Sequence, residues 1–469
     1  MDRKTVLVRA CVIFCGLLIS LSLLAQVPPN RLPLRGGQIK IFANGINIAW
    51  TRNDNFARDV TNFDEDNFTE ILDAIQAAGG NSCRWWLHTN GFASPQFDAD
   101  GYVTGLSSQE IPNMKKALDL AYERRIVISM CLWSFDMLQP QGQDQEMMKQ
   151  LVEDPDKTQS YIDNALIPIL QEIGDHPAVM CWEIFNEPEG MTTQFGWTPI
   201  KTNMQYVQQF INMLAGEIHR QVPSALVSNG SWNFKASTDV GNFTDYYRDD
   251  RLIAAGGDED GTLDFIMVHY YPEWEQNDTS PFHNSASHWG IDKPIVIGEF
   301  PANGITHERL APNNDGPSPE RTIEESHQYA YQNGYAGVMS WSWSDTQFGG
   351  FDAAKKGISF LSENYWHGLE AHDTLWDGDE GAFITALEDY LIGSVSVFPN
   401  PVNGDYLNIQ QDQINQISFF VSDMKRKILI DGNLTSEHNP IPVKGLPKGI
   451  YFLKLQSNDG FLIRKFVKN

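Results

Sequence analysis

The chain has 469 residues and a formal net charge of −26 at neutral pH. The first 25 residues contribute +2 and residues 394–469 contribute +3, so the stretch between them carries about −31. This charge disfavours nucleic acids, anionic membranes and strongly anionic polysaccharides as partners, whereas a neutral glycan is unaffected by it. The length allows one large domain followed by a small one.

The N-terminal residues predict a secretory signal peptide over residues 1–25. A basic start precedes an apolar stretch from Val6 to Leu24, and the small residue Ala25 follows, as in a cleavable signal. A membrane anchor is the alternative interpretation, but the chain turns polar and proline-rich directly after this stretch. No other stretch is long and apolar enough to span a bilayer, so we expect no membrane insertion of the mature chain.

Three cysteines, Cys83, Cys131 and Cys181, remain after the predicted signal peptide. Each lies inside a predicted buried strand, and their odd number shows no paired spacing. This pattern argues against a disulfide framework or a zinc site, so free thiols in the core are expected.

From residue 38 to about residue 393, short apolar runs alternate with amphipathic stretches. Eight runs of strand length occur, at Ile39–Ile48, Gly80–Leu87, Ile126–Leu132, Val179–Phe185, Ala225–Asn229, Phe265–His269, Ile295–Gly298 and Gly337–Trp341. Helical periodicity fills the intervals, most clearly at Asp64–Ala78, Ile111–Arg124, Thr158–Gly174, Thr202–Gln221 and Pro319–Asn333. Eight strand–helix alternations predict an α/β fold, a (β/α)8 TIM barrel over residues 38–393.

A glutamate follows two of these runs, at the point where the predicted strand ends. Glu187 follows the fourth run, within Asn186-Glu187-Pro188, and Glu299 follows the seventh. A lone glutamate after a strand is often a surface residue, but barrel active sites lie at this end of the strands. Glycoside hydrolysis requires two carboxyl groups, because its transition state is cationic at the anomeric carbon. We predict Glu187 as the acid/base, with a raised pKa, and Glu299 as the ionised nucleophile.

Other polar residues at strand ends are predicted to surround this pair. Arg84 lies within a barrel strand and needs a carboxylate partner, for which Glu299 or Glu183 would serve. A purely structural salt bridge is the alternative for this arginine. Tyr271 could donate its hydroxyl to Glu299, and His269 could bind the substrate or orient the acid. Simple packing in the core is the alternative for both.

Nine tryptophans crowd the predicted strand ends. Trp182 and one of Trp85 and Trp86 are assigned to the core, whereas the others lie where loops begin. Flat aromatic rings stack on the apolar faces of sugar rings, so the excess indicates several sugar subsites, with Trp341 as the floor of the cleavage subsite. The complete set of predicted substrate contacts is Arg84, His88, Trp133, Asn186, His269, Tyr271 and Trp341.

Acidic residues cluster at 258–260 and at 377–380. They could bind calcium, but they lack a regular ligand spacing. Solvated charge on a loop is the favoured interpretation, and no metal site is predicted.

The periodicity changes after Gly393. Short alternating runs separated by turn signals lie at Tyr406–Ile409, Ile417–Val421, Lys427–Ile430, Gly449–Leu455 and Phe461–Val467. This pattern predicts a small antiparallel β-sandwich over residues 394–469. A carbohydrate-binding function for this sandwich is weakened because the segment holds no tryptophan.

At these residues the chain resembles glycoside hydrolase family 5, a family of (β/α)8 retaining glycosidases. The motifs that carry the resemblance are Trp182-Glu-Ile-Phe-Asn-Glu-Pro188, His269-Tyr-Tyr271, Ile297-Gly-Glu-Phe300 and Trp341-Ser-Trp-Ser344. The resemblance covers about residues 38–393. It implies Glu187 as the acid/base and Glu299 as the nucleophile, with Arg84, Asn186, His269, Tyr271 and Trp341 around the cleavage subsite.

The third strand end departs from the family pattern. Many family cellulases carry histidines there, whereas this chain reads Cys131-Leu-Trp-Ser-Phe135. This departure puts a standard cellulase subsite in doubt. The eighth strand end, in turn, resembles that of some family β-mannanases and favours mannan slightly.

The tail resembles the C-terminal sorting domain of type IX secretion in Bacteroidetes. Val397-Phe-Pro-Asn-Pro401, Leu446-Pro-Lys-Gly-Ile-Tyr-Phe-Leu-Lys454 and the basic end Lys465-Phe-Val-Lys-Asn469 carry this resemblance. It implies export by the type IX machinery, followed by release or attachment to the cell surface.

Together these features predict a secreted, retaining endo-β-1,4-glycanase that needs no cofactor and acts as a monomer. Its substrate would be a neutral β-linked polysaccharide, mannan or glucomannan first, with cellulose or mixed-linkage glucan as the alternative. An exo-acting β-glycosidase is less favoured, because long tryptophan-rich loops suit an open cleft. A non-catalytic carbohydrate-binding surface protein is also less favoured, because both glutamates are present.

Overall fold

The computed structural model describes residues 30–365, except 38, 53, 275–276 and 306–319, and residues 395–469, except 412–416, 423–427, 435, 437 and 458–459. The chain divides into two compact units, Met1–Asn364 and Tyr365–Asn469. The predicted signal peptide, the boundary expected at residues 393/394 and the acidic cluster at 377–380 lie outside the described residues.

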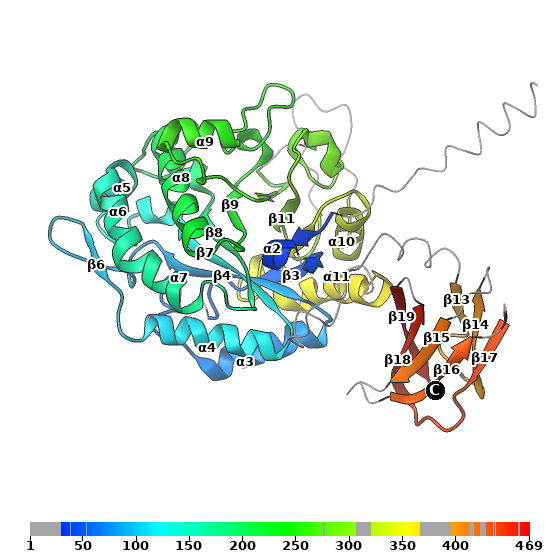
Figure 1. Cartoon of the computed structure of the whole chain (residues 1–469). Coiled ribbons are helices and arrows are strands. Elements are labelled where there is room, and N and C mark those ends of the chain that lie inside the picture. The colour runs from blue at the N-terminus through cyan, green and yellow to red at the C-terminus, as the bar shows by residue number, and fades with distance from the viewer. Residues whose placement is uncertain are drawn as a thin grey trace, which may run out of the picture. The chain divides into compact units, whose positions relative to one another are not determined.

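The first unit is built around a closed barrel of eight parallel strands (Figure 1). Each of the eight predicted apolar runs supplies one strand, so the predicted TIM barrel is confirmed. In barrel order the strands are β3 (Ala43–Asn47), β4 (Ser82–Thr89), β7 (Val127–Ser134), β8 (Val179–Asn186), β9 (Val227–Ser231), β10 (Ile266–His269), β11 (Ile295–Glu299) and β12 (Gly337–Ser340).

An α-helix follows each barrel strand, as in a (β/α)8 barrel, except that the described residues between β10 and β11 form only the 3-10 turns η5 (Asn277–Thr279) and η6 (Ala286–Trp289). The α-helices are α3 (Glu65–Ala77), α4 (Glu110–Glu123), α5 (Gln145–Glu153), α6 (Pro155–Tyr161), α7 (Ile167–Ile173), α8 (Met204–Gln221), α9 (Asp249–Gly256), α10 (Ile323–Gln332) and α11 (Gly350–Tyr365). A two-stranded ribbon of β5 (Gln96–Phe97) and β6 (Val103–Gly105) lies between β4 and α4.

The local sequence explains why these helices start where they do. Asp64 precedes α3 and its side chain accepts a hydrogen bond from the backbone N–H of Asn67, which satisfies one of the unpaired donors of the first turn. Thr322 and Glu325 form a reciprocal capping box at the start of α10. In α3, the apolar residues recur at helical spacing and are fully buried: Phe68, Ile71, Leu72 and Ile75.

Two predicted elements are divided in the structure. The run Ile39–Ile48 forms β2 (Ile39–Ile41) and β3, and β2 pairs antiparallel with β1 (Leu32–Pro33) across the tight turn labelled α2 (Leu34–Gly37). The helix expected at Thr158–Gly174 comprises α6, a π-helical turn over Ile162–Leu166, and α7. Pro168 lies near the start of α7 and has no N–H for a continuous helix, which accounts for the irregular turn before it.

The second unit consists of two antiparallel sheets, as predicted. One sheet has the order β13 (Val395–Phe398), β14 (Tyr406–Gln411), β17 (His438–Pro442). The other has the order β16 (Ile428–Leu434), β15 (Ile417–Ser422), β18 (Gly449–Ser457), β19 (Gly460–Lys468). Leu407, Ile441, Val421 and Leu453 join one hydrophobic core to which both sheets contribute.

The sequence pattern did not reveal β17. Its five residues, His438 to Pro442, include two prolines, which normally argue against a strand. The strand lies at the edge of its sheet, beside β14, where a missing N–H costs no ladder bond on the open side.

Among the described residues, no helix combines the length and the apolar character that crossing a membrane requires.

Candidate active site

The two predicted carboxylates meet at the C-terminal end of the barrel. Glu187 directly follows β8 and Glu299 is the last residue of β11. A carboxylate oxygen of each and one ring nitrogen of His269 all lie within 4.8 Å of one another. This close approach matches the arrangement of retaining glycosidases, in which the carboxyl groups are about 5 Å apart; inverting enzymes separate them by roughly 6.5–9.5 Å.

Glu299 is almost fully buried and is held from two sides. The guanidinium of Arg84 contacts its Oε1 directly, and the hydroxyl of Tyr271 donates to Oε2 at 2.8 Å. Burial raises the pKa of Glu299, and Glu187 adds to the rise, whereas Arg84 and Tyr271 lower it. These contacts therefore support the ionised form against the effect of burial.

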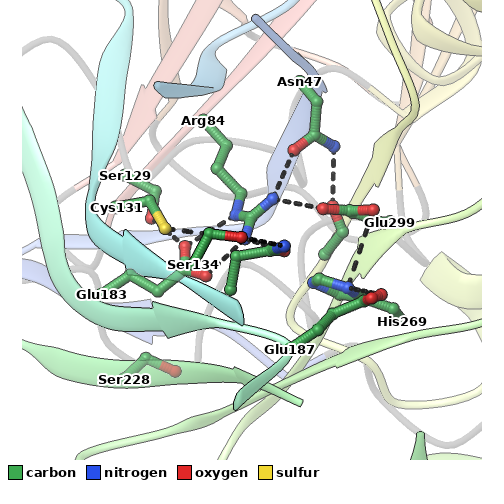
Figure 2. A network of polar contacts seen from close by, with 12 residues as sticks. Asn47, Arg84, Ser129, Cys131, Ser134, Glu183, Glu187, Ser228, His269 and Glu299 are labelled. Atoms are coloured by element: carbon green, nitrogen blue, oxygen red, sulfur yellow. Dashed lines mark hydrogen bonds and ion pairs between the residues drawn. The ribbon is translucent and has the colours of Figure 1, made fainter. Parts of the chain in front are cut away.

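Arg84 connects the strand ends through a buried polar network (Figure 2). Its Nε and Nη2 bind both oxygens of Glu183 at 2.7 and 2.6 Å. Nη1 also donates to Asn47 Oδ1 at 2.9 Å, and Nη2 donates to Asn186 Oδ1 at 2.9 Å. Arg84 thus has both of the carboxylate partners that the sequence offered as alternatives. A planar, permanently charged guanidinium suits such a two-sided role.

Close packing against the network leaves no room for a side chain at Gly230 of β9. A Cβ at Gly230 would lie 2.3 Å from Glu183 Oε1. Asn47 also ties β3 to its neighbours, because its Nδ2 donates to the carbonyl of Gly298 at 2.8 Å. The network is therefore closely packed and is held by backbone as well as side-chain atoms.

Glu187 has a different environment. Its backbone adopts the left-handed conformation (φ 46°, ψ 51°), which is uncommon outside glycine. Its side chain is 14 % exposed, and His269 Nδ1 lies 2.8 Å from its Oε1. The backbone N–H of Glu187 donates to the carbonyl of Gly230 at 2.6 Å.

His269 contacts both carboxylates, because its Nδ1 also lies 3.6 Å from Glu299 Oε2. Burial lowers the pKa of His269 to about 4. At neutral pH the imidazole is therefore uncharged. A neutral ring can donate to an ionised Glu187 or accept from a protonated one, depending on its tautomer.

An aromatic cluster adjoins this pair. Trp341, at the end of β12, packs against Trp50 and Trp86 with ring centroids 5.6 Å apart in each case. Its indole N–H donates to Asp345 at 3.1 Å, and its peptide bond to Ser342 is cis. Trp341 and Tyr271 each remain 8 % exposed. Trp182 and Trp85 are fully buried, as predicted for core residues.

A second group of aromatic residues follows β7, β8 and β9. Trp197 lies 5.3 Å from Phe135 and 6.2 Å from Trp232, and Phe195 packs on Trp232 at 5.2 Å. Trp197 is 43 % exposed, and Trp274, which follows β10, is 60 % exposed. Exposed rings at the end of the barrel that carries the carboxylates suit the stacking of sugars.

His88 and Trp133 do not fit their predicted role as substrate contacts. Both side chains are fully buried and pack on one another with ring centroids 4.9 Å apart, with Tyr161 against each. His88 Nδ1 bonds Ser94 at 2.8 Å, and burial lowers the pKa of His88 to about 3. The two rings contact Tyr161 of α6 and no surface is left on them for a sugar.

Several residues of the site escaped the sequence-based prediction. Asn47 and Ser134 complete the hydrogen bonds of Arg84 and Asn186, since Asn186 Nδ2 donates to Ser134 at 3.2 Å. Glu183, by contrast, was named from the sequence as a possible partner of Arg84. A further acid, Glu189, is fully buried two residues after Glu187, and an acidic residue in a turn carries no signal that distinguishes it from a surface residue.

Glu187, His269 and Glu299 are also the residues that could hold a metal ion among those described. The permanently charged Arg84 contacts one of the two carboxylates, and this positive charge opposes a second cation. In the acidic cluster at 258–260, Asp258 pairs with Arg220, which agrees with solvated loop charge. The three remaining cysteines are free and buried, as predicted.

Both parts of the chain are similar to known proteins. Residues 396–469 match the family model described as a secretion system C-terminal sorting domain. A mannan endo-1,4-β-mannosidase from Mytilus edulis is 34 % identical over 352 residues, which are 70 % of this chain and 90 % of the relative. A second one, from Cryptopygus antarcticus, is 30 % identical over 66 % of this chain and 82 % of its own length.

Solved structures give the same result. The β-mannanase of the blue mussel Mytilus edulis superposes with a TM-score of 0.62 at 32 % identity and covers 73 % of this chain and 98 % of its own. The endo-1,4-β-mannanase of Eisenia fetida superposes with a TM-score of 0.62 at 32 % identity. The match covers 71 % of this chain and 94 % of the Eisenia fetida chain.

Proposed function

The chain belongs to the family of mannan endo-1,4-β-mannosidases, and we propose that Glu187 and Glu299 carry out retaining hydrolysis of β-1,4-mannan in it. The approach of their carboxylate oxygens to within 4.8 Å is the single observation that carries this proposal. Two carboxylates this close leave no space for a water on the far side of the sugar, so a covalent intermediate is favoured over inversion.

In the first step, Glu187 protonates the glycosidic oxygen while Glu299 attacks the anomeric carbon. The bond to the leaving sugar breaks, and a glycosyl–enzyme ester forms on Glu299. In the second step, Glu187, now ionised, takes a proton from water as the water attacks the same carbon. The ester bond breaks, Glu299 is released as a carboxylate and Glu187 regains its proton.

The surroundings suit these two roles. Arg84 and Tyr271 hold Glu299 ionised and directed at the sugar, although it is buried. His269 contacts Glu187 and is uncharged, so it can follow the proton cycle of Glu187 without adding a charge to the site. Arg84 and His269 thus act on the substrate through the two carboxylates.

The sugar contacts are assigned to Asn186 and to the aromatic rings at the strand ends. Asn186 uses one of its N–H groups on Ser134, and its second N–H is assigned to a hydroxyl of the sugar at the cleavage point. Trp341 forms the floor beneath that sugar. Trp197, Trp232 and Trp274 supply rings for further sugars, which favours a polymer and internal cleavage.

The C-terminal domain directs the chain to the secretion machinery, so the protein acts outside the cell or on its surface. We propose that residues 394–469 form this sorting domain and that the catalytic unit acts as a monomer. Size-exclusion chromatography of the full chain tests the second point.

The function is tested by reducing-sugar release from galactomannan, glucomannan, carboxymethyl-cellulose and mixed-linkage glucan, with the products sized. Oligosaccharides from galactomannan and glucomannan are expected. Release from the two glucans alone would replace the proposal by an endoglucanase, and release of monosaccharide only would make the enzyme exo-acting.

A further inference from the structure

Glu189 stands two residues after Glu187, in the 3-10 turn η3 (Pro188–Met191), and its side chain has no exposed surface. In the described part of the chain, its hydrogen-bond partners are all neutral. Oε1 accepts from the hydroxyls of Ser231 at 2.7 Å and Tyr247 at 2.5 Å, and Oε2 accepts from the backbone N–H of Trp232 at 3.1 Å.

A buried carboxylate with only neutral partners is uncommon, because burial disfavours the charged form. Burial raises the pKa of Glu189 to about 7, and its hydrogen bonds counter that rise. A perturbed acid beside a reaction centre is a candidate for a functional role. Its complete burial, however, excludes direct contact with a sugar.

The turn that contains Glu189 also sets the direction of Glu187. The left-handed backbone at Glu187 is strained for a residue with a side chain, so neighbouring contacts must hold it. The carbonyl of Glu187 accepts from the N–H of Gly190 at 3.0 Å. Gly190 in turn lies under the Trp197 ring, which a Cβ would approach to 2.6 Å.

The partners of Glu189 belong to two places in the chain, the end of β9 with the residue after it and the segment before α9. Ser231 is the last residue of β9, Trp232 begins the loop that follows, and Tyr247 precedes α9. The carboxylate therefore binds the turn after β8 to the loop after β9. Trp232, whose backbone it fixes, belongs to the exposed aromatic group of the site.

We infer that Glu189 is a positioning residue that holds the acid/base Glu187 in reach of the glycosidic oxygen. This inference rests on the proposed function. Proton transfer in the transition state requires the acid within hydrogen-bond distance of the leaving oxygen. A displacement of about 1 Å at such a group costs on the order of 10²-fold in rate.

The test compares substrates that need the acid with substrates that do not. Glu189→Gln keeps the size of the side chain but replaces one acceptor oxygen by an NH2 donor, so the hydroxyls of Ser231 and Tyr247, together with the backbone N–H that also binds the carboxylate, can no longer all donate to it. On mannan, kcat/KM is expected to fall roughly 10- to 100-fold. On a 2,4-dinitrophenyl β-mannobioside, whose leaving group departs without a proton, the rate of forming the glycosyl–enzyme should fall less than about threefold.

Azide supplies a second readout. It attacks the anomeric carbon of the glycosyl–enzyme without needing a general base, displaces Glu299 and yields a β-mannobiosyl azide. Glu189→Gln should therefore turn over the activated substrate faster with azide and form this product, as Glu187→Ala should. Wild-type enzyme should form none.

Glu110→Gln is the matched control. Glu110 is also fully buried and accepts hydrogen bonds from Ser94 and from the N–H of Ser107, but it is the first residue of α4. This variant should lower the unfolding temperature and leave the ratio of the two substrate rates at its wild-type value. If Glu189→Gln does not fold, Tyr247→Phe, which removes one of the three donors, should show the same selective loss to a smaller degree.

Equal loss on both substrates without formation of the azide, or no loss on mannan, would overturn the positioning role. Failure of the proposed function is separate, since Glu187→Gln would then keep wild-type activity on mannan.

Discussion

The end of β11 and the turn after β8 each place one glutamate at the C-terminal end of the barrel, but the two surroundings differ. Glu299 is buried and bound by a cation and a phenol. Glu187 is partly exposed, has strained backbone and contacts a neutral imidazole. The two environments, rather than the residue type, are what distinguishes the proposed nucleophile from the proposed acid.

Removal of the nucleophile should have the largest effect. Glu299→Gln cannot form the ester, so kcat on mannan should fall by at least about 10⁴-fold. Initial-rate assays of reducing sugar, with circular dichroism to confirm the fold, measure this. Retention of more than a hundredth of the activity would contradict the role.

Removal of the proposed acid/base should lower kcat less than removal of the nucleophile does. Glu187→Gln should lower kcat on mannan by about 10²- to 10⁴-fold, the range that general acid catalysis contributes. On an activated aryl glycoside the first step should survive and a burst of phenol should appear, because only the second step is slow. A uniform loss without a burst would argue that the two glutamates have the opposite roles.

Loss of the arginine in the buried network should lower the unfolding free energy more than loss of an arginine in a surface ion pair. Arg84→Met leaves Glu183 and Glu299 buried without their cation, and such a loss costs about 3–5 kcal/mol of unfolding free energy. Urea denaturation measures it. Arg248→Met, which removes exposed pairs with Asp239 and Asp250, should change stability far less. Equal effects would mean that the network is not what holds the barrel end.

A smaller effect is expected from Tyr271→Phe, and it should appear in the pH dependence of activity. The hydroxyl of Tyr271 lowers the pKa of Glu299, so Tyr271→Phe should raise it. Because hydrolysis requires ionised Glu299, activity should be lost at a higher pH as the solution is acidified. A shift of about half to one pH unit in the acid limb of kcat/KM is expected from one hydrogen bond. An acid limb that stays in place would exclude Glu299 as the group that titrates there.

The smallest effect is expected at Trp133. Trp133→Phe should lower the unfolding free energy by about 1–2 kcal/mol and leave kcat within about twofold, since the ring is buried. Trp341→Phe, at the sugar floor, should reduce kcat/KM while stability changes little. A loss of activity at Trp133 would restore its predicted role as a substrate contact.

The eight barrel strands and both carboxylates were predictable because their signals are local. Apolar runs of strand length alternate with helical periodicity, and the glutamates stand where the runs end. His88 and Trp133, predicted as substrate contacts, are fully buried in the structure. Proximity to a strand end does not reveal the direction in which a side chain points. β17 was missed because an edge position, which tolerates proline, is a property of the whole sheet.

The sequence alone determined the barrel, the sorting domain and the placement of two glutamates at strand ends, because periodicity and motifs are local properties of the chain. Only the tertiary structure decided which neighbours those carboxylates acquire. Arg84 reaches Glu183 and Glu299 across 99 and 215 residues of chain, and Glu189 reaches Tyr247 across 58. Such contacts depend on the closure of the barrel, and that closure sets the burial and the partners on which each pKa depends.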